Sequence, residues 1–125
     1  MEKAGLYIHI PFCKSKCPYC DFYSGKYSRE AAENYASELI DEFCKYGGAE
    51  FDTVYFGGGT PSILEPRLIA KILQAARKSF KIADNSEITI ECNPSKDLKE
   101  DIEIYAASGI NTVSYTHLTL PTILR

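Results

Sequence analysis

The sequence has no long apolar run and no tract of basic residues. No segment is apolar over the roughly 20 residues needed to cross a bilayer, and residues 1–5 lack the apolar core of a secretion signal. The 125 residues carry a net charge of −3, without a Lys/Arg stripe along any segment. These absences argue against a membrane span and against nucleic acid as the main partner, and they predict a cytoplasmic protein.

The cysteines also lack the arrangement of a secreted disulfide framework, because their number is odd and three of them crowd together. Cys13, Cys17 and Cys20 form a C-x3-C-x2-C motif directly after an apolar run. No second C-x2-C pair completes a zinc site, and a thioredoxin-like C-x-x-C at Cys17 and Cys20 leaves Cys13 unexplained. Three thiolates best suit a four-iron cluster with one iron open to a small molecule. Zinc binding and simple redox chemistry remain the alternatives.

Two other residues that could bind metal are interpreted as structural. Cys44 is expected on the buried face of a helix, where a lone cysteine behaves as a core residue. His9 alternates with Ile8 and Ile10 in the first apolar run and therefore faces away from them. We expect its side chain to be packed and hydrogen-bonded rather than a metal ligand.

Hydrophobic periodicity predicts an α/β fold. Strands are expected at residues 6–10, 53–56 and 87–91, with a fourth beginning at Ile110. Helices are expected from Ser28 to the glycines at 47–48, from Pro66 to about Phe80, and over 97–107. Three strand–helix units and the start of a fourth strand indicate a parallel sheet. We favour the N-terminal part of a partial (β/α) barrel over a flat, doubly wound sheet.

Each unusual motif directly follows or ends one of these strands. The cysteines follow the first strand, Gly-Gly-Gly-Thr-Pro at 57–61 follows the second, and Glu91 ends the third. The carboxyl ends of parallel strands form the ligand-binding edge of such folds. The glycines could let a ligand approach the backbone, or simply form a tight turn. Glu91 could accept hydrogen bonds from an ammonium group or a ribose, or be an ordinary strand end facing solvent.

Taken together, the motifs at 7–22, 57–62 and 91–94 resemble the radical S-adenosylmethionine (SAM) family of oxygen-independent coproporphyrinogen III oxidases and their HemW-type relatives. The resemblance implies that Cys13, Cys17 and Cys20 hold a [4Fe–4S] cluster whose open iron binds SAM. It further implies one-electron cleavage of SAM to a 5′-deoxyadenosyl radical. The positions implied to contact SAM or to lie near it are Tyr7, Tyr19, Gly58, Gly59, Thr60 and Glu91.

One departure from the family pattern distinguishes its branches. Coproporphyrinogen oxidases have a further cysteine two residues after the third ligand, where this chain has Phe22 preceded by Asp21. The resemblance is therefore to the HemW-type branch, which binds heme and transfers it to acceptor proteins. Its implied partners are heme or a porphyrin, an electron donor protein and a heme-accepting protein. The alternatives are a coproporphyrinogen oxidase, which would be the oxidoreductase of that name, and a small metal-binding or redox module without SAM chemistry.

The C-terminal segment departs from the strand–helix pattern. Residues 113–122 are rich in Thr, contain Pro121 and coincide with one reading frame of the adapter DNA of transposase-based sequencing libraries. We interpret residues 1–112 as the N-terminal part of a radical SAM core domain and residues 113–125 as a non-native tail. His117 then has no functional meaning, and the fragment alone is expected to be inactive. A natural Thr-rich tail is the alternative.

Overall fold

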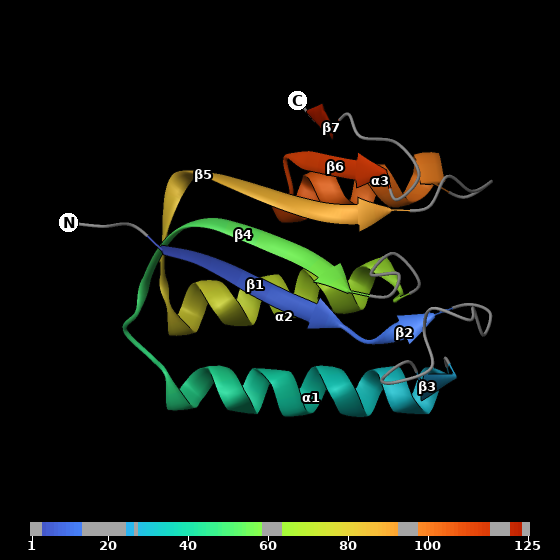
Figure 1. Ribbon diagram of the computed structural model, residues 1–125, viewed down its shortest axis with the longest axis horizontal. Coiled ribbons are helices and arrows are strands. Elements are labelled where there is room, and N and C mark those ends of the chain that lie inside the picture. The colour runs from blue at the N-terminus through green and yellow to red at the C-terminus, as the bar shows by residue number, and fades with distance from the viewer. Residues whose placement is uncertain are drawn as a thin grey trace.

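A parallel sheet forms the centre of the computed structural model, which describes residues 4–13, 25–26, 28–58, 64–92, 98–115 and 121–123. Its strands lie in the order β1 (Ala4–Ile10), β4 (Glu50–Gly58), β5 (Lys81–Cys92), β6 (Thr112–Tyr115) and β7 (Pro121–Ile123). The first four strands are parallel, so their carboxyl ends share one edge (Figure 1), whereas β7 pairs antiparallel with β6. The short strands β2 (Phe12–Cys13) and β3 (Gly25–Lys26) form a separate parallel pair.

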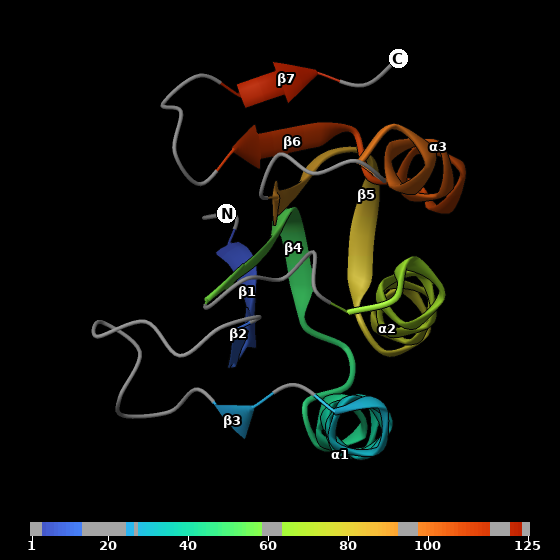
Figure 2. The same cartoon turned by 90° about the vertical axis from the view of Figure 1, so that its right-hand side faces the viewer.

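The three helices α1 (Arg29–Lys45), α2 (Pro66–Ser79) and α3 (Leu98–Ser108) lie along one face of the sheet (Figure 2). A doubly wound sheet would carry helices on both faces, whereas a barrel keeps them outside and leaves the inner face open. The expectation of a barrel-type α/β fold is therefore confirmed. None of the described helices is long and apolar enough to span a membrane.

Local sequence explains where the helices begin and end. The Ser28 hydroxyl caps α1 by accepting a hydrogen bond of 3.0 Å from the backbone N–H of Ala31. Pro66 occupies the first turn of α2, where its missing N–H costs no helical hydrogen bond. Gly109, with φ of +110°, follows α3 in a conformation that favours glycine. The predicted positions of all three helices are confirmed to within about two residues, the ordinary uncertainty of helix boundaries.

The core lies between the sheet and the helices. The strands supply alternate residues to it, and α2 supplies one apolar face, as expected from periods of two and 3.6 residues. Burying one such aliphatic side chain contributes about 1.5–3 kcal/mol, which makes this layer the main source of stability. The most deeply buried aliphatic and phenyl side chains include Ile8, Ile10, Val54, Phe56, Leu68, Ile69, Ile72, Leu73, Ile88 and Ile90.

Strands β4 and β5 begin earlier than the sequence pattern predicts. Residues 50–51 of β4 pair with residues 81–82 of β5, outside the predicted strands. The Phe80 ring packs edge-on against the rings of both Phe43 and Phe51, at centroid distances of 5.3 and 5.1 Å. This aromatic contact extends the packed region past the start of the strands that were predicted from the apolar runs.

The expectation that Cys44 is a core residue is wrong. Its side chain is exposed, and the neighbouring Phe43 occupies the buried position instead. Successive helical residues are rotated by about 100°, so only one of these two neighbours can face the core. Phe43 lies on the same buried face of α1 as Ala32 and Ala36.

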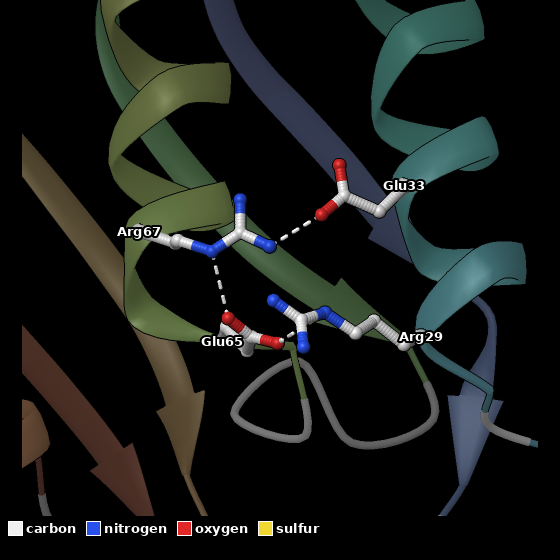
Figure 3. A network of polar contacts seen from close by, with 4 residues as sticks. All are labelled: Arg29, Glu33, Glu65 and Arg67. Carbon is white, nitrogen blue, oxygen red and sulfur yellow. Dashed lines mark hydrogen bonds and ion pairs between the residues drawn. The ribbon is translucent and has the colours of Figure 1, made fainter.

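An ion-pair network joins the amino-terminal ends of α1 and α2 (Figure 3). Arg67 of α2 donates to Glu65 at 2.7 Å and also to Glu33 of α1. Arg29 of α1 lies 3.5 Å from the other oxygen of Glu65. All four side chains are at least one-third exposed, so the network orients the helix ends more than it stabilises the fold.

Asn111 aligns β6 with β5 through its side chain. Its carboxamide oxygen accepts from the Ile88 N–H at 2.9 Å, and its amide nitrogen donates to the Ser86 carbonyl at 2.8 Å. The Asn111 backbone N–H donates to the Ile88 carbonyl at 3.0 Å. These bonds satisfy backbone groups at the point where β6 joins the sheet.

Candidate functional site

The carboxyl ends of β1, β4 and β5 bring polar side chains together on the face of the sheet opposite the helices. Ile8 and Ile10 of β1 are buried toward the helices, whereas Tyr7 and His9 face away and are exposed. The predicted alternation is therefore confirmed, but the expectation of a packed His9 is wrong, because its side chain is exposed. The inner face of a partial barrel is open to ligands where no further element covers it.

Glu91, near the end of β5, is bound through both of its carboxylate oxygens. One oxygen accepts from the Tyr55 hydroxyl at 2.9 Å, and the other accepts from the Gly58 backbone N–H at 3.1 Å. Two positions that the sequence marked as site residues, Gly58 and Glu91, are thus directly connected. The contact joins β4 to β5 at the carboxyl edge of the sheet.

The aromatic rings of Tyr7 and Tyr55 stack across β1 and β4. Their centroids are 5.7 Å apart and their planes differ by 11°, in keeping with their directly paired positions in the two strands. Gly57 lies beneath them: a Cβ atom there would be 2.5 Å from the Tyr7 hydroxyl oxygen and 2.9 Å from the Tyr55 ring. The absence of a side chain at Gly57 therefore makes room for the tyrosine pair.

Gly58 fulfils two requirements for glycine at once. Its φ of +122° is a conformation that side chains rarely adopt. A Cβ atom would also lie 2.6 Å from the Ile10 carbonyl oxygen and 2.9 Å from the His9 ring. The backbone of β4 consequently approaches the end of β1 more closely than any other residue would permit. The third glycine and Thr60 lie outside the described residues.

Both tyrosines of the pair are held in the protonated form at neutral pH. Burial raises the pKa of Tyr7, and the negative charge of Glu91 raises it further. Burial also raises the pKa of Tyr55, and the hydrogen bond to Glu91 adds to this effect, while a hydrogen bond from the Ser114 hydroxyl lowers it. Tyr55 therefore remains the donor in its contact with Glu91.

The backbone leading into the cysteine motif is anchored to α1. The Tyr35 hydroxyl donates to the His9 carbonyl oxygen, and the Tyr35 ring packs edge-on against Phe12 with centroids 5.7 Å apart. Phe12 and Cys13 form β2, so Cys13 lies three residues after the end of β1, as the sequence indicates. Cys17, Tyr19 and Cys20 lie outside the described residues, and the described ones hold no group of three or more potential metal ligands.

Comparisons with known proteins show the family and the fold of this chain. A family model described as the radical SAM superfamily matches residues 7–122. The chain belongs to the radical SAM superfamily. Among the curated relatives, the heme chaperone HemW of Escherichia coli K12 is 37% identical over 114 residues, covering 87% of this chain and 30% of the relative. HemW of Lactococcus lactis is 35% identical over 86% of this chain and 28% of the relative.

Other known proteins are similar to a comparable degree. Anaerobilin synthase of Escherichia coli O157:H7 is 35% identical over 90% of this chain and 27% of the relative. The solved structure of coproporphyrinogen III oxidase (HemN) from Escherichia coli, described as a radical SAM enzyme, matches with a TM-score of 0.77 and 28% identity. That match covers 91% of this chain and 28% of the oxidase. The chain thus spans less than a third of the length of these relatives.

Sequence reasoning missed three side chains that shape the site. Tyr55 and Ser114 contact the Glu91 region, and Tyr35 anchors the end of β1. For Tyr55 a signal was present, since it alternates with the buried Val54 and Phe56 and must face the same side of the sheet as Tyr7. Tyr35 instead matched the apolar positions of an ordinary amphipathic helix. Only the packing of α1 against β1 reveals its hydrogen bond to the His9 carbonyl oxygen.

Proposed function

We propose that the chain is the N-terminal part of the core domain of a HemW-like heme chaperone that binds a [4Fe–4S] cluster and SAM. The observation that supports this proposal is that Glu91 accepts hydrogen bonds from Tyr55 and Gly58 at the carboxyl edge of the sheet. Cys13 follows β1 at the same edge. A carboxylate held there suits a ligand with ammonium or hydroxyl donors. The HemW relatives at 35–40% identity support the heme-handling branch.

The residues present fit the cluster and SAM. We assign Cys13, Cys17 and Cys20 as the three thiolate ligands, which leave one iron open for SAM. Gly58 lets the end of β4 lie close to β1, where a Cβ atom would meet the Ile10 carbonyl oxygen, and its N–H binds Glu91 there. When bound, the reduced cluster supplies an electron that cleaves a carbon–sulfur bond of SAM. The residues assigned to SAM binding or its surroundings are Tyr7, Tyr19, Gly58, Gly59, Thr60 and Glu91.

A heme carrier and a coproporphyrinogen oxidase would share this site and differ elsewhere. Phe22 stands where the oxidases have an additional cysteine, which favours the chaperone. The second candidate, a coproporphyrinogen III oxidase, is supported by the similarity to the HemN structure. Heme or a porphyrin, an electron donor and a heme acceptor are the partners we propose for the longer protein, in the cytoplasm. A 125-residue part of it would neither catalyse a reaction nor transfer heme alone.

The cluster is tested by anaerobic reconstitution of the chain with iron and sulfide. We expect the broad visible absorbance of a [4Fe–4S] centre, its electron paramagnetic resonance signal after reduction, and their loss in Cys13→Ala. Cys44→Ala is the matched control, because Cys44 is exposed and outside the motif, and it should retain the full iron content. Tight zinc binding without any cluster would overturn the proposed cluster and SAM site and favour a simple metal-binding module.

The choice between the two heme-related functions needs the longer gene product that contains this chain. We expect it to bind heme, seen as a Soret absorbance band on titration, and to transfer heme to an acceptor protein. It should not decarboxylate coproporphyrinogen III under reducing conditions with SAM. Measured decarboxylation would reject the HemW-like assignment and establish the oxidase.

A further inference from the structure

The Tyr55 hydroxyl occupies a central position on the inner face of the sheet. Its ring is fixed by stacking on Tyr7 of β1, and its hydroxyl donates to Glu91 of β5. Strand β4, which carries it, lies between those two strands. A donor fixed on both sides in this way restricts the rotation of the carboxylate that it binds.

We propose that Tyr55 is a positioning residue of the SAM site, whose hydroxyl fixes the Glu91 carboxylate in the orientation that binds the cofactor. This inference rests on the proposed function, because it takes Glu91 as a cofactor ligand. Tyr55 itself is not assigned a contact with SAM. The Ser114 hydroxyl also contacts Tyr55, but Ser114 belongs to the segment interpreted as a non-native tail.

The hydrogen-bonding capacity of Glu91 explains how it can serve both purposes. An ionised carboxylate has about four acceptor sites on its two oxygens. Tyr55 and Gly58 occupy one site on each oxygen, which leaves one further site on each for the donors of a ligand. Without the Tyr55 hydroxyl, only one of these two donors, the Gly58 N–H, still binds the carboxylate. The carboxylate can then rotate about the side-chain bonds of Glu91. A ligand would then have to order it on binding, at a cost in affinity.

The first measurement is the affinity of the reconstituted chain for SAM, determined by equilibrium dialysis with the wild type and with Tyr55→Phe. We expect the variant to bind about tenfold more weakly, since a hydrogen bond to a charged group is stronger than a neutral one. Tyr46→Phe is the matched control, because it deletes the same hydroxyl from an exposed tyrosine distant in sequence from the motifs. It should leave the affinity unchanged.

A double-mutant cycle separates positioning from simple packing. If Tyr55 acts through Glu91, Tyr55→Phe should change SAM affinity less than about twofold once Glu91→Gln is present, because the two contributions are coupled. If the Tyr55 hydroxyl acts independently, the effects of the two substitutions should multiply. The second result would overturn the inference even if the single variant binds weakly.

A measurement without cofactor tests the contact between Tyr55 and Glu91 independently of SAM binding. In nuclear magnetic resonance spectra, the Gly58 amide proton reports its hydrogen bond to Glu91. We expect its chemical shift to move in Tyr55→Phe and to remain in place in Tyr46→Phe. An unmoved Gly58 signal would refute the positioning role. A wild-type chain that carries a cluster but binds no SAM would instead reject the proposed cofactor site, whatever the Gly58 signal shows.

Discussion

The Tyr35 hydroxyl donates a hydrogen bond to the carbonyl oxygen of His9, which ties α1 to the carboxyl end of β1. His9 lies four residues before Cys13, so this bond fixes the backbone from which the cysteine motif departs. The edge-on packing of Tyr35 against Phe12 adds a second contact within the same segment. The helix that follows the cysteines in sequence thus supports the strand that precedes them.

We predict that Tyr35→Phe lowers the free energy of unfolding by about 0.5–1.5 kcal/mol, the usual net contribution of one hydrogen bond. The ring and its contact with Phe12 remain, so the change isolates the hydroxyl. Urea denaturation followed by circular dichroism measures it. Tyr46→Phe should be neutral because Tyr46 is 64% exposed. Equal stabilities of Tyr35→Phe and the wild type would show that the bond to His9 contributes nothing to stability.

A pair of glycine substitutions tests the close approach of β4 to β1. Gly48 and Gly58 both have positive φ, but a Cβ atom at Gly48 meets nothing within 4 Å, whereas one at Gly58 meets the Ile10 carbonyl at 2.6 Å. We expect Gly48→Ala to cost about 1 kcal/mol through backbone strain alone. Gly58→Ala should cost clearly more, and it should also displace the N–H that binds Glu91.

Thermal or urea denaturation compares the two alanine variants directly. The difference between them contains the steric contact at Gly58 together with the difference in backbone strain, because φ is +91° at Gly48 and +122° at Gly58. Equal losses of stability would mean that the end of β1 shifts easily to accommodate a side chain, and that the approach at Gly58 is not a fixed feature of the site.

The sequence predicted the architecture well because its signals are local. Helix caps, glycine stops and apolar periodicity located all three helices and the four parallel strands. The site was predicted in part: Gly58 and Glu91 were both named, and their strand ends indicated one edge. The hydrogen bond between Gly58 and Glu91, and the second one from Tyr55 to Glu91, depend on the register between β4 and β5. No local sequence pattern specifies that register. The prediction for Cys44 was wrong because helical periodicity does not tell which of two adjacent residues, Phe43 or Cys44, lies at the edge of the apolar face.

Tyr105 of α3 offers a test of a buried polar group. Its side chain is fully buried, and its hydroxyl has no hydrogen-bond partner within the described part of the chain. Removing an unsatisfied buried hydroxyl relieves a desolvation cost of about 1–3 kcal/mol. We therefore predict that Tyr105→Phe raises the free energy of unfolding, measured by urea denaturation at neutral pH. A loss of stability would indicate that the hydroxyl is bound in solution.

The origin of the C-terminal segment is decided at the DNA level. Residues 113–122 include β6 residues that pair in parallel with β5 and part of β7, which pairs antiparallel at the sheet edge. We propose that residues 113–125 are translated adapter, and we expect the source reads to match adapter sequence from about codon 113. Genomic sequence that continues through Arg125 would instead make β6 and β7 native strands. In that case Ser114 would join Tyr55 as a residue of the site.

Alkaline pH tests the burial of Cys92 at the end of β5. Burial raises the pKa of its thiol from 9.0 to about 12, and the charge of Asp101 contributes to the increase. Between these two values the folded protein binds a proton that the unfolded chain has released. The contribution of the neutral thiol to stability is therefore complete below pH 9 and is lost as the pH rises toward 12, by up to about 1.4 kcal/mol per pH unit.

Cys92→Ala separates this titration from the other effects of high pH. The variant loses packing at every pH, but we expect its stability to fall less steeply than that of the wild type above pH 9, because one linked group is gone. Several tyrosines with raised pKa values, Tyr105 among them, preserve part of the slope in both proteins. Cys44→Ala is the control for the removal of a thiol from an exposed position. Parallel pH profiles for the wild type and Cys92→Ala, measured by urea denaturation, would show that water reaches the Cys92 thiol in the folded chain.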